Sequence, residues 1–269
     1  MKQKTQSISQ IKPGLCKALD YFFTDIDDTL TTGGILPSES YAAIFALAQA
    51  GIKVVPVTGR PGGWCDMIAR YWPVEAVIGE NGAFYFSYDR HSKKMKRRYF
   101  FGDKEMDKAR AALTEIEQQV REKIPRAKIA ADQGFRLWDL AIDFKEDLPE
   151  PLSAEEIQSI CRIFEDHGAR YKVSSIHVNG WYGDFDKLGC VRRYLEDQAH
   201  QSWSDLRGKI IYIGDSLNDE PLFAGFDYSI GVANLKDFWG QLEYFPTYLT
   251  SRASGDGFVE AVKTILHYR

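Results

Sequence analysis

Short apolar runs alternate along the first part of the chain with segments that have helical spacing. Residues 21–24 form an apolar, aromatic run that ends abruptly at the acidic cluster 25–28, which is typical of a buried strand. Residues 38–50 carry apolar side chains at helical spacing and stop at Gly51, a residue suited to a left-handed helix cap. A second apolar run follows at 53–57. This alternation predicts βαβ units in a parallel sheet with right-handed crossovers.

The alternation continues with a helix beginning near 61–64 and a strand at 76–78. It resumes after residue 184, where we expect strands at 209–213 and 228–232 and helices over 188–198, from residue 218 and over 257–267.

Between these two parts, residues 86–183 follow a different pattern. The expected elements are two strands around a basic turn, helices over 104–124 and 153–167, strand-like pieces near Lys128 and Leu140, and a strand over 172–178. Ser153 and Glu156 form a capping-box pair at the start of the second helix. We therefore predict an α/β fold: a doubly wound parallel sheet built from residues 1–85 and 184–269, with an inserted α+β cap at 86–183.

Composition and charge exclude several classes of protein. The chain has 269 residues, of which 44% are hydrophobic and 27% charged, as in ordinary globular proteins. Its 34 basic and 38 acidic residues leave a net charge of −4, so no overall basic field would draw it to nucleic acid. No apolar run has the length of a membrane span, and residues 1–15 lack the pattern of a signal peptide. The four cysteines are far apart, which indicates reduced thiols. We expect a cytoplasmic protein with no nucleic-acid or membrane partner.

Polar residues follow three of the expected core strands. They are Asp25, Asp27, Asp28 and Thr29 after the first strand, Thr58 after the second, and Asp215, Asn218 and Asp219 after the strand at 209–213. Taken singly, each could be a helix N-cap or a turn former. Because ligands of open parallel sheets bind at the carboxyl ends of the strands, we expect these residues to converge. Crowded carboxylates require a cation, and an all-oxygen ligand set favours Mg²⁺, whose usual co-ligand is a substrate phosphate.

Four motifs, in this order, resemble those of the haloacid dehalogenase (HAD) superfamily. Residues 22–30 resemble its first motif, an apolar strand followed by DxDxT, and residues 57–60 resemble its second. Lys187 is similar to the lysine of the third motif, and residues 214–219 match the GDxxND form of the fourth. The long insert and the sequence ENGA at 80–83 resemble subfamily IIB, which includes Cof-type, sucrose-phosphate and mannosyl-phosphoglycerate phosphatases. The departures are Asp28, where many members have Gly, and Leu188, which separates Lys187 from Gly189.

The resemblance implies catalytic roles for four residues. Asp25 would attack phosphorus in line and form an aspartyl phosphate. Asp27 would act first as general acid toward the leaving group and then as general base toward water. Thr58 and Lys187 would bind the phosphoryl oxygens, where negative charge must be stabilised.

The resemblance also implies a metal site and a substrate site. Mg²⁺ would be held by Asp25, the Asp27 carbonyl oxygen and Asp215, with Asn218 and Asp219 orienting ligands or waters. Arg60 could either reach an anion or brace the acidic loop after the first strand. The residues expected to bind substrate or phosphate are Thr29, Gly59, Arg60 and Asn81.

The implied function is Mg²⁺-dependent hydrolysis of a small phosphorylated metabolite, either a sugar phosphate or a glycosyl phosphoglycerate. Two alternatives remain. A phosphomutase of the same fold, similar to phosphomannomutase, would move phosphate within one sugar. A phospho-receiver module also clusters aspartates around Mg²⁺, but it places the phosphoacceptor on a later strand and lacks a long insert. The substrate, the cap residues that read it and the choice between monomer and homodimer stay open.

Two features of the insert lead to further expectations. The basic run 93–98 is typical of a solvated hairpin, although it could guide a phosphorylated substrate. We expect the insert to join the core near 84–86 and 180–184, with Trp181 and Tyr182 in hinge packing and Gly180 and Gly183 absorbing rotation.

Overall fold

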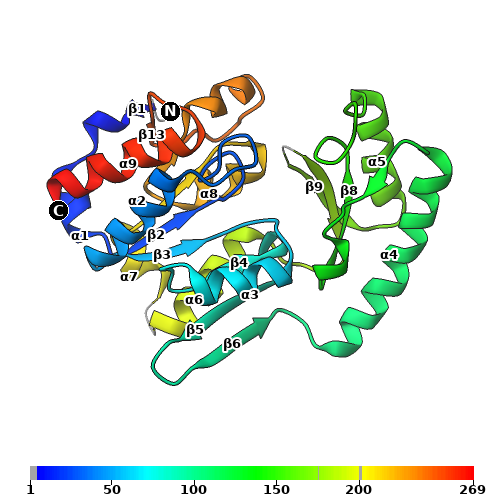
Figure 1. Ribbon diagram of the computed structural model, residues 1–269, viewed down its shortest axis with the longest axis horizontal. Helices are drawn as coiled ribbons and strands as arrows, with labels where there is room; N and C mark the ends of the chain where they lie inside the picture. Colours follow the sequence, from blue (N-terminus) through cyan, green and yellow to red (C-terminus); the bar gives the residue numbers. More distant parts are fainter. Residues whose placement is uncertain (1–4, 175, 200–201) are drawn as a thin grey trace.

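A parallel sheet forms the centre of the larger part of the molecule (Figure 1). This computed structural model describes residues 5–174, 176–199 and 202–269. The strand order is β1-β13-β12-β11-β2-β3, and every neighbouring pair is parallel. The strands are β1 (Gln6–Ser7), β2 (Tyr21–Thr24), β3 (Lys53–Pro56), β11 (Ile210–Gly214), β12 (Ser229–Gly231) and β13 (Tyr248–Leu249). The predicted α/β fold is thereby confirmed.

Helices cover both faces of this sheet because its strands are apolar on both sides. Phe22 belongs to one buried cluster and its neighbour Phe23 to the other. The first cluster includes side chains of α1 (Pro13–Ala18), α2 (Ser38–Gln49), α3 (Gly62–Tyr71) and α9 (Ser254–Tyr268). The second includes side chains of α6 (Lys187–Ala199), α7 (Trp203–Leu206) and α8 (Glu220–Gly225). None of the helices in the described ranges is both long and apolar enough to cross a membrane.

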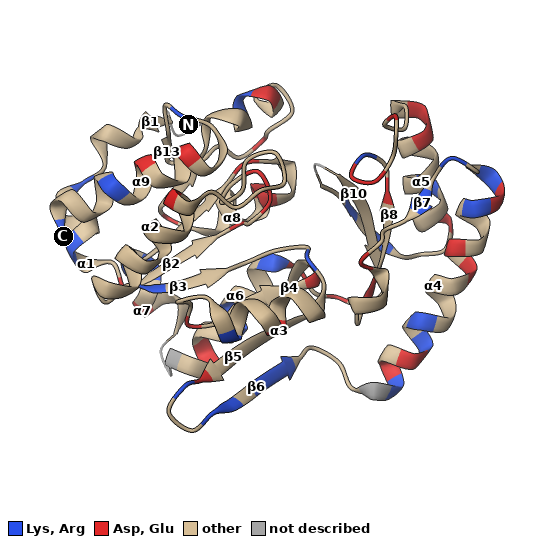
Figure 2. Ribbon diagram, viewed as in Figure 1, with Lys and Arg blue, Asp and Glu red and all other residues tan. Residues whose placement is uncertain are grey.

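An antiparallel hairpin extends the central sheet. Val57, next to β3, forms a parallel bridge with Ile78 in β4 (Val77–Gly79). β4 then pairs with β5 (Phe84–Asp89), and β5 pairs with β6 (Lys94–Tyr99), both antiparallel. The basic residues of β6 are exposed, as expected for a solvated hairpin (Figure 2). Since β5 and β6 continue the core sheet, we propose that the cap comprises residues 100–183, with its first boundary later than residue 86.

The cap is a four-stranded antiparallel sheet covered on one face by two helices (Figure 1). The strand order is β7-β8-β10-β9. Its elements are α4 (Asp103–Lys123), β7 (Lys128–Ile129), β8 (Asp139–Asp143), α5 (Ala154–Asp166), β9 (Arg170–Val173) and β10 (His177–Trp181). The capping box of Ser153 and Glu156 is present at the start of α5, as predicted.

The prediction of one strand over 172–178 was wrong. β9 ends at Val173, and β10 begins at His177 and runs back antiparallel to β9. The Ser174 hydroxyl accepts hydrogen bonds from the backbone N–H groups of Ile176 and His177, at 3.3 and 2.9 Å. A side chain that bonds backbone N–H groups in this way offers an alternative to the strand ladder, and the chain reverses there.

One expected hinge residue lies inside the cap sheet. Gly180 is a residue of β10, and a Cβ atom there would lie 2.0 Å from Phe164 Cε1. Gly180 is therefore a close-packing position. Gly183 follows β10, has φ +120°, and lies in the connection between cap and core.

Candidate active site

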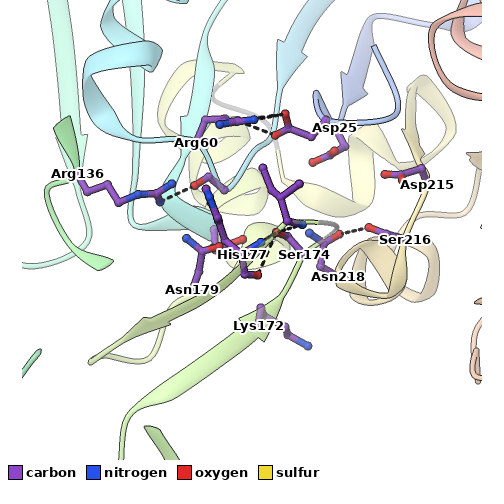
Figure 3. A pocket seen from close by; sticks show the side chains of 14 residues that line it. Asp25, Arg60, Arg136, Lys172, Ser174, His177, Asn179, Asp215, Ser216 and Asn218 are labelled. Carbon is purple, nitrogen blue, oxygen red and sulfur yellow. Dashed lines mark hydrogen bonds and ion pairs between the residues drawn. The ribbon is translucent and has the colours of Figure 1, made fainter. Parts of the chain in front are cut away.

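Four of the residues that follow the core strands, Asp25, Asp27, Asp215 and Asn218, line one cavity between core and cap (Figure 3). Side chains of both core and cap line it. Asp25 follows β2 and Asp215 follows β11, and these strands are adjacent in the sheet. The core residues that line the cavity are Asp25, Asp27, Gly59, Arg60, Asn81, Asp215, Ser216 and Asn218.

Two predicted site residues are buried below this surface. The Thr58 side chain is fully buried, and its hydroxyl accepts a hydrogen bond from the Arg60 backbone N–H at 3.0 Å. Thr29 is also fully buried, and its hydroxyl donates to Asp215 Oδ1 at 3.2 Å. Neither is among the residues that line the cavity. In this structure Thr29 contacts Asp215 and thereby supports a carboxylate of the site.

Lys187 joins two carboxylates at the start of α6. Its Nζ lies 2.8 Å from Asp25 Oδ1 and 2.9 Å from Asp219 Oδ1, and all three side chains are buried. Gly82 makes this placement possible, because a Cβ atom there would lie 2.2 Å from the Asp186 carbonyl oxygen. The lack of a side chain at Gly82 lets the backbone that carries Lys187 approach the loop after β4.

Asp219 organises the loop after β11. Its Oδ2 accepts hydrogen bonds from the backbone N–H groups of Asp215 and Ser216, at 3.0 and 3.3 Å. Its Oδ1 accepts a hydrogen bond from the Tyr212 hydroxyl at 2.6 Å in addition to the contact with Lys187. Both oxygens are thus engaged within the protein. Asn218 lines the cavity, and its Oδ1 accepts a hydrogen bond from the Ser216 hydroxyl at 2.7 Å.

The acidic cluster carries more negative charge than its one lysine balances. Burial raises the pKa of Asp25 to about 8, with Asp219 and Asp27 adding to the rise and Lys187 opposing it. Burial, together with the charges of Asp219 and Asp25, also raises the pKa of Asp215 well above its usual value. Carboxylate oxygens of Asp25, Asp215 and Asp219 all lie within 4.8 Å of one another. This all-oxygen cluster fits a hard divalent cation, which would remove the excess negative charge.

Arg60 braces the acidic loop, one of the two roles that the sequence left open. Its Nη2 lies 2.8 Å from Asp27 Oδ1, and its Nε lies 3.0 Å from Asp27 Oδ2. The same guanidinium reaches the cap, where Nη2 lies 2.9 Å from Glu146 Oε1. Only 7% of the Arg60 side chain is exposed. Arg60 therefore links the core residue Asp27 to the cap.

Glu80 forms a second link between core and cap that the sequence analysis missed. The residue is fully buried and follows β4. Its Oε1 accepts hydrogen bonds from the N–H groups of Gly62 (2.9 Å) and Leu137 (2.8 Å), and its Oε2 accepts one from Trp138 N–H (2.6 Å). The available signal was an acidic residue directly after an apolar strand, within the motif at 80–83. The neighbouring Asn81 lines the cavity with a φ of 55°.

The cap supplies residues to the cavity that the sequence did not identify. They are Arg136, Lys172, Ser174, Ile176, His177 and Asn179. In Figure 3, Lys172, His177 and Asn179 lie on the cap strands below the core residues Asp25 and Asp215. The alternation of His177 and Asn179 on β10 was a possible signal, but treating 172–178 as one strand concealed it.

The structure thus combines a parallel sheet, carboxylates clustered at the strand ends and an α+β cap. Residues 22–122 match the family described as haloacid dehalogenase-like hydrolase. No curated protein is significantly similar to the sequence.

Solved structures with this fold cover nearly the whole chain. A crystal structure of a Thermoplasma acidophilum protein is similar with a TM-score of 0.68 and 17% identity, over 93% of this chain and 98% of the other. A HAD/COF-like hydrolase from Plasmodium vivax has a TM-score of 0.69 and 14% identity, over 96% and 100%. Synechocystis sucrose-phosphatase in complex with sucrose and phosphate has a TM-score of 0.62 and 14% identity, over 93% and 97%. At identities of 14–17%, these similarities show a shared fold only.

Proposed function

We propose that the protein is a Mg²⁺-dependent phosphatase that hydrolyses a small phosphorylated metabolite through an aspartyl-phosphate intermediate. One observation carries the proposal. Asp25 lines the cavity with its carboxylate 2.8 Å from the Lys187 ammonium, beside Asp215 and Asp219. A buried carboxylate with an adjacent cation is suited to in-line attack on a phosphoryl group, because the cation stabilises charge on the equatorial oxygens.

Asp27 is the proposed acid and base. It lines the same cavity as Asp25, two residues along the chain. In the first step it would donate a proton to the leaving alcohol, and in the second it would take a proton from the attacking water. Its double contact with Arg60 fixes the direction of its carboxylate.

The proposed metal ligands are Asp25, the Asp27 carbonyl oxygen and Asp215. Thr29 and Asn234 support Asp215 through hydrogen bonds of 3.2 Å to Oδ1 and Oδ2. When bound, Mg²⁺ would balance the carboxylates and withdraw charge from a phosphoryl oxygen. Asn218 and Asp219 would orient the metal ligands without binding the metal themselves. Both Asp219 oxygens already accept hydrogen bonds within the protein, in keeping with this role.

The proposed substrates are sugar phosphates or glycosyl phosphoglycerates. Two structures that share the fold are named sucrose-phosphatase and trehalose-6-phosphate phosphatase, which supports this class. Five of the six cap residues that line the cavity are polar, as a hydroxylated leaving group requires. We also propose a cytoplasmic location, supported by four unpaired cysteines.

Phosphate release from a panel of phosphorylated sugars, phosphoglycerates and an aryl phosphate tests the proposal. We expect release that requires Mg²⁺, stops with a chelator and is poorly supported by Ca²⁺, which is larger and less demanding of octahedral geometry. Asp25→Asn should lower turnover at least ~1,000-fold, while Asp20→Asn, at a half-buried residue outside the cavity, should not. Full activity in the chelator, or more than about a tenth of it in Asp25→Asn, would refute the assignment. Isomerised sugar phosphate as the main product would identify a phosphomutase instead.

A further inference from the structure

We infer that Lys172 and Asn179 of the cap form a subsite for an anionic group on the leaving alcohol, so that the natural substrate is a phosphate monoester whose alcohol part carries a carboxylate or a second phosphate. The inference rests on the proposed phosphatase function and narrows its substrate class.

The cap sheet turns a polar face to the cavity. Leu140, Ile142 and Val178 belong to the apolar cluster that the cap helices cover. Side chains alternate along a strand, so His177 and Asn179 lie on the opposite face from Val178. Lys172 on β9 is directly paired with Asn179, which places both side chains on that same polar face.

These residues line the cavity together with the proposed nucleophile Asp25. Asn179 is 3% exposed, and its Nδ2 donates to Asp139 Oδ2 at 2.9 Å. That bond fixes the amide, and no described residue donates to its Oδ1. His177 is also 3% exposed, with Nε2 3.1 Å from Glu146 Oε2. The Asn179 amide is therefore oriented before any substrate binds.

Lys172 differs from the other cations around the cavity. A second cavity adjoins the first, since both are lined by Asn81, Lys172 and Asn218. Every other lysine or arginine that lines either cavity forms an ion pair: Arg60 with Asp27 and Glu146, Arg136 with Asp132 and Asp139, Arg170 with Asp184, and Lys187 with Asp25 and Asp219. Among the described residues, none pairs with Lys172.

Lys172 also lies where a leaving group would extend. The second cavity is lined by Lys172 together with Arg170 and Trp181. The transferring phosphoryl group already has Lys187 beside Asp25. An anion on the distant part of the substrate would meet Lys172 and Asn179, and a charge-assisted hydrogen bond would hold it.

Matched pairs of esters test this assignment in the full-length protein with Mg²⁺. The pairs are 6-phosphogluconate and sorbitol 6-phosphate, 3-phosphoglycerate and glycerol 3-phosphate, and fructose 1,6-bisphosphate and fructose 6-phosphate. The first two pairs differ by a carboxylate and the third by a phosphate, so they distinguish the two kinds of anion. We expect kcat/KM to be at least ~10-fold higher for the anionic member of at least one pair.

Lys172→Gln should lower kcat/KM for the preferred anionic ester ~10-fold and change its neutral partner less than ~2-fold. Lys172→Arg should restore most of the loss, and the exposed Lys123→Gln should have no effect. Equal losses for both members would mean that Lys172 contacts the transferring phosphoryl group, which overturns the inference. So would a preference for the neutral member in every pair. No release from any ester, an aryl phosphate included, would refute the proposed function and with it this inference.

Discussion

Glu146 of the cap and Arg60 of the core form an ion pair, with Oε1 and Nη2 2.9 Å apart. The Arg60 guanidinium also contacts Asp27, so one side chain connects the cap to the proposed acid and base. Closure of the cap should therefore help to fix Asp27.

Glu146→Gln should weaken the link between the cap and Asp27 without changing any of the proposed reacting groups. The Glu146 side chain is 33% exposed, so we expect an effect of about 1 kcal/mol or less, equivalent to an up to ~5-fold fall in kcat/KM. The fall should be larger for an alkyl phosphate than for an aryl phosphate, since the alkyl leaving group depends more on Asp27. Steady-state kinetics on both esters would measure it. The matched control is Glu150→Gln, on an exposed residue nearby. Equal losses on the two esters would contradict the link to Asp27.

The stability contribution of Glu146 should depend on pH. Contact with the His177 imidazole and the Arg60 guanidinium holds the pKa of Glu146 at about 2, against an ordinary value of 4.5. A lowered pKa in the folded state stabilises the protein above the unfolded value, and this stabilisation is lost as pH falls toward the folded value. The difference in unfolding free energy between the unmodified protein and Glu146→Gln should thus be constant above about pH 5 and shrink below it. Urea unfolding at pH 7, 5 and 3.5 would measure the difference, and a difference that grew on acidification would contradict the ion pair.

Asp27→Asn should slow the reaction of alkyl phosphates, whose leaving group needs a proton, more than that of aryl phosphates. We expect the rate of aspartyl-phosphate formation to fall ~100-fold or more for an alkyl phosphate and much less for an aryl phosphate, whose phenolate leaves unaided. Single-turnover quench experiments would give this rate directly. Asp28→Asn is a suitable control because it changes the adjacent carboxylate, and asparagine tolerates the φ of 55° found there. The acid role would be excluded by equal losses for both leaving groups.

Glu80→Gln should destabilise the junction between core and cap. The buried carboxylate accepts backbone hydrogen bonds from Gly62, Leu137 and Trp138, and an amide offers only one oxygen to these donors. At least one buried N–H group would lose its partner, so we expect a loss of about 2–4 kcal/mol in chemical unfolding. The exposed Glu75→Gln is the control. A loss below ~0.5 kcal/mol would mean that the contact does little for stability.

The core could be predicted because its pattern is local. The apolar run at 21–24 and the acidic residues after it specify a buried strand with carboxylates at its end, and parallel topology then brings Asp25 and Asp215 together. The strands of the cap were harder to predict because the end of β9 depends on hydrogen bonds to the Ser174 side chain. The links that Arg60 and Glu80 make to the cap were also beyond prediction, since their partners there lie far along the chain, at Glu146 and at Leu137 and Trp138.

The bonds made by Glu80 have a consequence for how such a protein can diversify. Glu80 binds main-chain N–H groups, which every residue except proline carries. As far as this attachment is concerned, the side chains at Leu137 and Trp138 are interchangeable. A cap of altered sequence could therefore dock on an unaltered hydrolytic core, so that new substrate preferences can evolve without rebuilding the chemistry.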